Sequence, residues 1–280
     1  GRHRQLDEAK DARAQVLLKV LDRQLEAATK KLLVEDFKSG DAVRQQHAAQ
    51  LLGSLGRVSL PLLVDIIKQE EELRVRQIAA SLLADLGPKA VAVLKRELVL
   101  EIAPQERVRI LEVVDSVTRA LKTELAYALG EKNPEVRQAA FRLAERLNDK
   151  QTTDLILAYA ADGDSELATS AIRCLGKLKP VGIVDVLVSL MNSGRDEDHV
   201  LACCQAMGQV ADSACIESLG KILSTRKGWF SRKKWTPQVR AAAAFALGQI
   251  AHLRAAEVLA LFTDDPDPRV RQIAQASLNK

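Results

Sequence analysis

Apolar and polar positions follow a helical period along most of the chain, and the pattern itself recurs. Four segments superpose without a gap when aligned on Val136, Leu167, Val239 and Val270: 133–147, 164–178, 236–250 and 267–280. Weaker copies place Arg44, Val75, Glu106 and His199 at this anchor position, so that eight anchors are separated by 31, 31, 30, 31, 32, 40 and 31 residues. A recurring period of this length predicts a stack of similar units, each too small to bury its apolar face alone.

Each unit is expected to contain two helices. Six of the eight positions three residues before the anchor hold Asp, Asn or Thr, which are good helix N-caps, and four copies place Pro next, at the first helical position. The anchor and the positions 4, 7, 8 and 11 residues after it are apolar or small, forming one stripe of a helix. The first helices of the pairs are expected in the apolar stretches between the copies, such as 60–68, 180–191 and 255–262.

The segments DDPDPRVRQIAQASL (264–278) and PQVRAAAAFALGQI (237–250) resemble the HEAT repeat, particularly the short bacterial kind of the phycobilisome-lyase type. The resemblance covers residues 39–280 and implies an all-α fold, a right-handed α-solenoid of about eight HEAT-like helix pairs. It also implies that an Asp before each second helix and an Arg just after the anchor interact along the stack. The matching arginines are Arg76, Arg107, Arg137, Arg240 and Arg271, whereas Ala168 and Val200 interrupt the series. Repeat three has two possible registers, with either Glu106 or Val108 as its anchor.

Two segments depart from the period. Residues 1–38 are expected to form a long N-terminal helix that caps the solenoid or connects it to another element. The 40-residue spacing locates an insertion at 224–235, between the two helices of repeat seven. Because no apolar run reaches the roughly 18 residues that span a bilayer, we expect a soluble module. The resemblance to the short bacterial HEAT repeats implies a bacterial source, and we expect the module to be part of a larger protein. Four cysteines without CxxC spacing are expected to be free thiols in the reducing cytoplasm.

The insertion is the first candidate binding surface. The chain has a net charge of +4, and five cations lie in this one stretch, so the rest sums to −1. The stretch also contains both tryptophans. Its candidate residues are Arg226, Lys227, Trp229, Phe230, Arg232, Lys233, Lys234 and Trp235. These side chains either bind a protein partner, a membrane surface or nucleic acid, or fold back as a small satellite core with solvated cations.

The second candidate surface is the face of the second helices opposite the buried stripe. Positions 2 and 6 residues after the anchor are expected to face a groove that is neutral and mixed, without the cationic track that duplex DNA requires. Its one polar cluster is predicted from Glu112, Arg142, Arg173 and Gln205, which would converge on a peptide carboxylate or another anion. The alternative is a solvated helix face that contains an Arg–Glu pair.

The sequence favours a binding scaffold over an enzyme. It contains no catalytic triad, phosphate loop, paired carboxylates or metal-ligand spacing, so we expect no cofactor and no metal. The favoured function is a non-enzymatic protein-protein interaction scaffold. Two alternatives remain open. One is binding of nucleic acid or a membrane surface through 226–235, and the other is an enzyme that resembles the HEAT-like DNA glycosylases or the chromophore lyases.

Overall fold

The computed structural model describes residues 27–162, 165–193, 196–224 and 235–279. These residues form α-helices and three short 3₁₀ helices, and no strand occurs among them. The α-helices are α2 (Ala27–Lys38), α3 (Ala42–Ser54), α4 (Leu60–Gln69), α5 (Leu73–Asp85), α6 (Pro88–Val99), α7 (Pro104–Val113), α8 (Lys122–Leu129), α9 (Pro134–Leu147), α10 (Lys150–Asp162), α11 (Ser165–Leu178), α12 (Ile183–Ser193), α13 (Glu197–Val210), α14 (Ile216–Leu223), α15 (Pro237–Leu247), α16 (Leu253–Ala260) and α17 (Pro268–Leu278). The 3₁₀ helices are Gly56–Val58, Val114–Ser116 and Ser213–Cys215.

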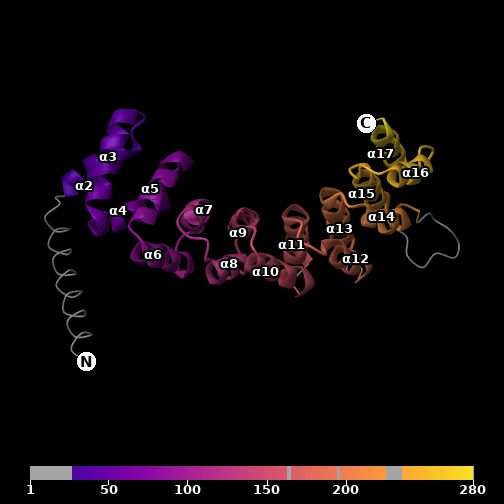
Figure 1. The fold of residues 1–280 in the computed structure, drawn as a ribbon, viewed down its shortest axis with the longest axis horizontal. Helices are drawn as coiled ribbons and strands as arrows, with labels where there is room; N and C mark the ends of the chain where they lie inside the picture. Colours follow the sequence, from indigo (N-terminus) through magenta and orange to yellow (C-terminus); the bar gives the residue numbers. More distant parts are fainter. Residues whose placement is uncertain (1–26, 163–164, 194–195, 225–234, 280) are drawn as a thin grey trace, which may run out of the picture. The chain divides into compact units, whose positions relative to one another are not determined.

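Consecutive helices make eight pairs, from α2 and α3 to α16 and α17, which confirms the expected all-α solenoid (Figure 1). Every second helix, from α3 to α17, begins where the repeat predicts it. Helix α2 packs on α3 and completes the first pair. The remainder of the expected long N-terminal helix lies outside the described residues.

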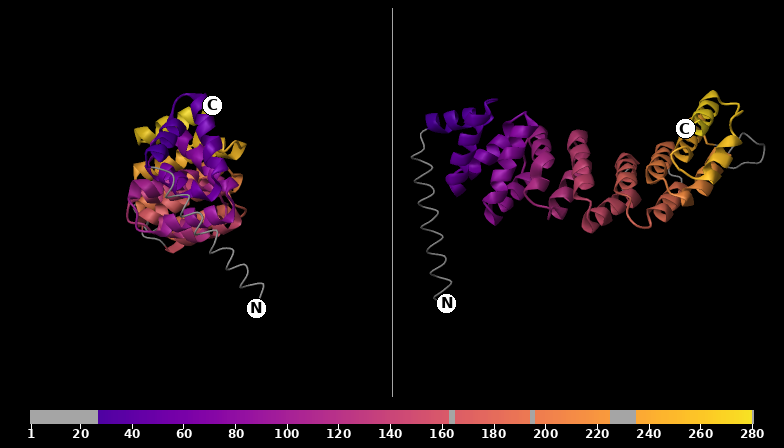
Figure 2. Two further views of the ribbon diagram at one scale, coloured as in Figure 1. Left: turned by 90° about the vertical axis from the view of Figure 1, so that its left-hand side faces the viewer. Right: turned by 45° about the horizontal axis from the view of Figure 1, so that its top comes forward.

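The described residues divide into two compact units, a first one that ends at Leu143 and a second one that begins at Ala144. In the first unit the second helices α3, α5 and α7 lie side by side, and α4 and α6 pack against them (Figure 2). In the second unit α11, α13, α15 and α17 lie side by side, while α12, α14 and α16 form the other layer. Each unit is therefore two layers of helices with the core between them.

Capping groups fix the start of the second helices. The carboxylates of Asp41 and Asp267 each accept two backbone N–H groups of the first turn. Asn133 does the same for α9, while Asp196 and Thr236 each accept one N–H group. These are the predicted N-cap residues, and together they set the register of the stack.

The apolar stripe packs as the repeat predicts. The residue four positions after the anchor is at most 2% exposed in all eight copies: Ala48, Ala79, Ile110, Ala140, Ala171, Cys203, Ala243 and Ala274. Small side chains here allow neighbouring helices to approach closely. Ile110 is fully buried, which settles repeat three in favour of the Glu106 anchor.

Buried arginines join the second helices α7 and α15 to the end of the helix before each of them. Arg107 Nε donates to the carbonyl of Leu98 at 3.0 Å, and Arg240 Nε donates to that of Leu223 at 3.0 Å. His199, which occupies an apolar anchor position, is fully buried and its Nε2 lies 3.1 Å from the carbonyl oxygen of Leu190. A ring nitrogen therefore makes the corresponding helix-end contact in repeat six, where Val200 replaces the arginine.

Candidate functional site

The residue six positions after the anchor lies on the outward face of the second helices, and it is exposed as predicted. In seven of the eight copies that residue is exposed, and Glu112 is the half-buried exception. The position two residues after the anchor was predicted to be equally accessible, and in three copies this is wrong: Thr169, Leu201 and Ala241 are only 5%, 9% and 8% exposed. Closely packed neighbouring helices in the second unit cover these side chains.

The predicted cluster of four polar side chains separates into three local arrangements. Glu112 receives a hydrogen bond from the buried guanidinium of Arg76 on the neighbouring helix α5. Arg142 Nη2 lies 3.4 Å from Gln138 Oε1, one turn earlier in its own helix. Arg173 on α11 donates from Nε to Gln205 Oε1 on α13 at 3.1 Å. The structure thus brings Arg173 and Gln205 together, in the second unit.

A shallow cavity of about 320 Å³ opens beside this Arg173–Gln205 contact, on the face formed by α11, α13 and α15. We call it the Phe245 depression. Its lining consists of Arg173, Lys177, Cys204, Gln205, Gly208, Gln209, Phe245, Ala246 and Gln249. Cys204, Gly208 and Ala246 are buried small residues, whereas Arg173, Gln205 and Phe245 are exposed. The depression is therefore a gap above small residues, with long side chains around it.

Glycines bring these helices close together. A Cβ atom on Gly208 would lie 3.0 Å from Ala246 Cα, and one on Gly176 would lie 2.7 Å from Ala206 Cα. Real Cβ atoms essentially never approach a backbone atom as closely as the second distance. The close approach of α11 and α13 lets Arg173 reach Gln205, and it fixes the spacing of the residues around the depression.

The charge in the depression is positive. Its lining contains Arg173 and Lys177 and no carboxylate. Lys177 Nζ pairs with Glu145 at 2.8 Å. Within the described residues, the guanidinium of Arg173 hydrogen-bonds through Nε, to Gln205, and the residue is exposed, so both terminal nitrogens are available to a ligand. These donors suit an incoming carboxylate or backbone carbonyl.

Phe245 supplies the apolar part of the site and is 53% exposed. Sequence reasoning placed Phe245 on the outward face but did not single it out. The available signal was an aromatic residue at a position that is polar or small in the other seven copies. The depression itself was not predictable in this way, because it depends on small residues from adjacent helices.

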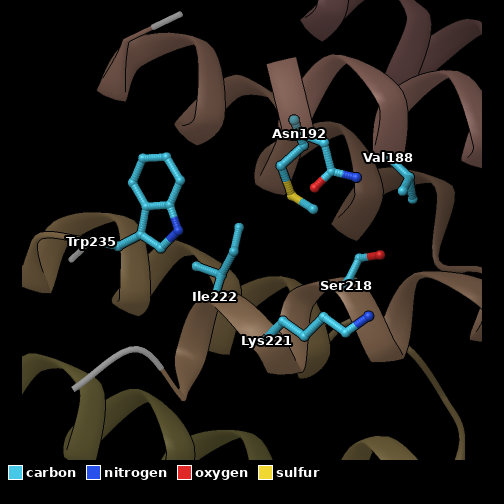
Figure 3. Close-up of a pocket in the computed structure, with 7 residues that line it drawn as sticks. Val188, Asn192, Ser218, Lys221, Ile222 and Trp235 are labelled. Atoms are coloured by element: carbon cyan, nitrogen blue, oxygen red, sulfur yellow. The ribbon is translucent and has the colours of Figure 1, made fainter. Parts of the chain in front are cut away.

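Most of the basic-aromatic insertion lies outside the described residues, including Arg226, Lys227, Trp229, Phe230, Arg232, Lys233 and Lys234. On either side of the insertion, α14 ends at Leu223 and Thr236 caps α15. Trp235 is described and half-buried, and it lines a second cavity between α12 and α14 (Figure 3).

The cysteines are all buried, and none forms a disulfide. Burial raises the pKa of Cys174 and of Cys204 to about 12, and burial likewise raises the pKa of Cys215 to about 11. Burial, with the neighbouring Cys204, also raises the pKa of the Cys203 thiol. In the part of the chain that the structure describes, no three His, Cys, Asp or Glu side chains are placed to hold a metal ion. No described helix is long and apolar enough to cross a membrane.

The profile of the HEAT repeats matches residues 122–208 and 184–279, which together cover more than half of the chain. No curated protein sequence matches. Among solved structures, importin beta has a TM-score of 0.52 and 12% identity, covering 88% of this chain and 40% of its own. Kap121p bound to the extreme C-terminus of the phosphatase Cdc14p has a TM-score of 0.51 and 14% identity, covering 96% of this chain and 32% of its own.

Human deoxyhypusine hydroxylase in complex with glycerol is also similar, at 17% identity over 93% of this chain and 97% of its own. Its TM-score of 0.39 is too low to support an argument about this chain. At these identities, the two karyopherin-type structures show that the fold is a helical-repeat solenoid.

Proposed function

Because the chain belongs to the HEAT-repeat family, we propose that it is a non-enzymatic protein-protein interaction scaffold that binds its partner on the face formed by α11, α13 and α15. One observation carries this proposal. An exposed aromatic ring, Phe245, stands over a cavity next to the solvent-facing guanidinium of Arg173. Aromatic and arginine side chains commonly contribute most of the binding energy at protein interfaces.

The shape and chemistry of the Phe245 depression favour a segment of polypeptide. Its volume of about 320 Å³ is at the lower end of the range of small-molecule pockets, about 300–1,000 Å³. One apolar side chain of a partner would pack on Phe245. The amides of Gln205, Gln209 and Gln249 can both donate and accept, so they match the backbone of an extended segment.

The positive charge of Arg173 favours polypeptide segments that carry a negative charge. Arg173 offers two terminal donor nitrogens at the edge of the depression, which lacks carboxylates in its lining. A carboxylate of the partner would form a bidentate pair with the guanidinium. The proposed partner segment therefore has an apolar side chain next to an acidic one or a C-terminal carboxylate. Glu112 and Arg142, the other members of the sequence-predicted cluster, would contribute contacts on the first unit.

The comparisons support protein binding at a general level. Kap121p, a solenoid of the same fold, holds the extreme C-terminus of another protein. We also propose that the inserted segment contacts the protein partner. Its candidate contact residues are Arg226, Lys227, Trp229, Phe230, Arg232, Lys233, Lys234 and Trp235. The four free thiols support a reducing, cytoplasmic setting for the chain, which we propose to be a module of a larger protein.

Site-specific photocrosslinking tests the proposal. A photoreactive benzoylphenylalanine replaces Phe245 in one variant and Leu253, a more exposed residue on α16, in a control. Irradiation in the source cells is expected to give a discrete protein adduct at position 245 alone, and Arg173→Glu is expected to abolish it. Adducts that form equally at position 253, or that survive Arg173→Glu, would show that this face is not the binding surface.

A further inference from the structure

The polar groups that α11 and α13 present to the Phe245 depression are hydrogen-bond donors. Arg173 donates from Nε to Gln205 Oε1 at 3.1 Å, which leaves its Nη1 and Nη2 available to a ligand. Because Nε can only donate, the carbonyl oxygen of Gln205 faces Arg173, and the NH₂ group of Gln205 is the end that remains for a ligand. Gln209 Oε1 lies 2.7 Å from the point that a Cβ atom on Gly176 would occupy. Both glutamines therefore turn their carbonyl toward α11 and keep an NH₂ group for the depression.

A donor-rich lining suits a ligand group that only accepts hydrogen bonds. An ionised carboxylate has two oxygens with about four lone-pair sites and no donor. Its two oxygens match the parallel N–H groups of the Arg173 guanidinium, so the pair is bidentate. The hydrogen bond to Gln205 holds the guanidinium in place, which reduces the conformational freedom that it loses on binding. An ammonium group, in contrast, would meet only donors and a like charge.

The charge around the depression matches one carboxylate. Lys177 lies one turn after Arg173 in α11, and its Nζ pairs with Glu145 of α9 at 2.8 Å. The charges of these three residues sum to +1. A single carboxylate neutralises that charge, whereas a phosphate group carries about −1.5 to −2 at pH 7. A phosphate or a run of acidic residues would therefore place uncompensated negative charge beside Glu145.

The floor of the depression leaves room for an apolar side chain next to that carboxylate. Cys204, Gly208 and Ala246 are small and buried, and the space above them is about 320 Å³. Phe245 is 53% exposed at the same depression, so its ring offers apolar surface to an incoming side chain. The ligand therefore combines one apolar side chain and one carboxylate within a small space.

The end of a polypeptide chain meets this requirement better than its interior. Neighbouring side chains of an extended segment point to opposite faces, and side chains that share a face are about 6.5 Å apart along the segment. In the last residue of a chain, the side chain and the carboxylate are bonded to the same Cα atom. The α-carboxylate also has no side-chain rotamers to lose, whereas fixing a Glu side chain costs conformational entropy.

We infer that the Phe245 depression is a receptor for the C-terminus of a protein partner, and that it takes an apolar last residue with a free α-carboxylate. The inference rests on the protein-binding function proposed for this face and specifies the partner's chemistry. Arg173 binds the carboxylate as a bidentate pair, and the NH₂ groups of Gln205 and Gln209 donate to the carboxylate or to the last backbone carbonyl. The apolar side chain packs on Phe245 above the small residues of the floor.

Peptide selection with and without a free C-terminus tests the inference. Random synthetic octapeptides with a free C-terminal carboxylate are selected for binding to the chain, and those that also bind an Arg173→Gln variant are removed. A second library of the same composition ends in a C-terminal amide. Binding is then followed by ¹⁹F NMR of a chain with 4-fluorophenylalanine at position 245, whose signal reports on the depression itself.

The free-carboxylate library is expected to yield peptides that end in Leu, Ile, Val, Met or Phe, and the amide library is expected to yield none. A selected peptide is expected to shift the fluorine signal. Converting its carboxylate to an amide, or adding two glycines after its last residue, is expected to weaken binding about ten-fold or more, because hydrogen bonds to a charged group are lost. Arg173→Gln is expected to have a similar effect. Arg254→Gln, at an exposed arginine of α16, is the matched control and is expected to have little effect.

Equal binding of the acid and amide forms, with the fluorine signal shifted by both, would overturn the inference and leave the proposed function standing. Selected peptides with a polar last residue, or binding that leaves the fluorine signal unmoved, would also overturn it. N-acetyl-leucine that binds as tightly as the octapeptide would assign the depression to a small carboxylate ligand instead. If neither library yields a binder, the inference fails, and crosslinking at position 245 then decides the proposed function by itself. The comparison of acid and amide peptides needs no substitution at Arg173, so it does not depend on the folding of that variant.

Discussion

The guanidinium of Arg240 and the carboxylate of Asp265 form a bidentate ion pair between repeats seven and eight. Arg240 Nη1 donates to Asp265 Oδ1 at 3.2 Å, and Nη2 donates to Oδ2. Both side chains are shielded, with exposed fractions of 7% and 0%. Arg107 makes the corresponding contact with Glu131, which also lies five residues before the next anchor. In these two repeats the arginine thus pairs with a carboxylate two residues before the next N-cap, and this series of pairs is called the arginine ladder. Asp265 additionally accepts the backbone N–H of Asp267 at 3.0 Å.

Breaking this pair is expected to destabilise the C-terminal repeats strongly. Asp265→Ala leaves the Arg240 guanidinium buried without its counter-charge, which typically costs about 3–5 kcal/mol in the free energy of unfolding. Urea unfolding and hydrogen exchange of α15 and α17 measure the effect. The control is Glu35→Ala, which removes the exposed Lys31–Glu35 pair and is expected to cost less than about 1 kcal/mol. Equal effects of the two substitutions would show that the ladder does not stabilise the stack.

Glycine within the helices is expected to be required where neighbouring helices touch and dispensable elsewhere. Gly176→Ala would place a Cβ atom 2.7 Å from the Ala206 backbone, so it is expected to destabilise the chain despite the better helix propensity of Ala. Gly220→Ala in α14 meets only Val258 Cγ1, at an ordinary contact distance of 3.5 Å. It is expected to be neutral or to stabilise by up to about 1 kcal/mol. Thermal unfolding measures the stability of the two variants. A Gly176→Ala variant as stable as the Gly220→Ala variant would contradict the close contact between α11 and α13.

The thiols are expected to be unreactive in the folded chain. Their raised pKa values keep them protonated at pH 8, and burial blocks the reagent, so Ellman's reagent is expected to label four thiols in denaturant and essentially none in the native chain. Rapid native labelling of any thiol would contradict the packing of its helix.

The same shifts predict a loss of stability at alkaline pH. Because the folded-state pKa values lie above the unfolded ones, the thiols stabilise the fold fully below pH about 8.5. This contribution falls as unfolded thiolates form, and it is lost by about pH 12 for Cys174 and Cys204. Urea unfolding at pH 8 and pH 10 is expected to show the decrease, and replacing Cys203 by Ala is expected to make it smaller.

The repeat made the helix starts, the caps and the buried stripe predictable from sequence. Asp41, Asn133 and Asp267 were identified as caps because a short polar side chain before a helical pattern has one dominant local use. The ion pair of Glu112 with Arg76 was not predictable in the same way. Arg76 lies 36 residues away in the sequence, and the two side chains meet only when the helices pack. The burial of Thr169 and Leu201 likewise depends on how closely α11 and α13 approach their neighbours, a property of helix pairs that a single-helix pattern does not contain.

The central claim is that the face of α11, α13 and α15 binds a protein segment through Phe245 and Arg173. The most direct test is the affinity of the partner crosslinked at position 245, measured by isothermal titration calorimetry with the wild-type chain, Phe245→Ala, Arg173→Glu and the control Leu253→Ala. We predict that the first two variants bind about ten-fold or more weakly while their circular dichroism is unchanged, and that Leu253→Ala binds like wild type. Wild-type affinity in both folded site variants would contradict the account.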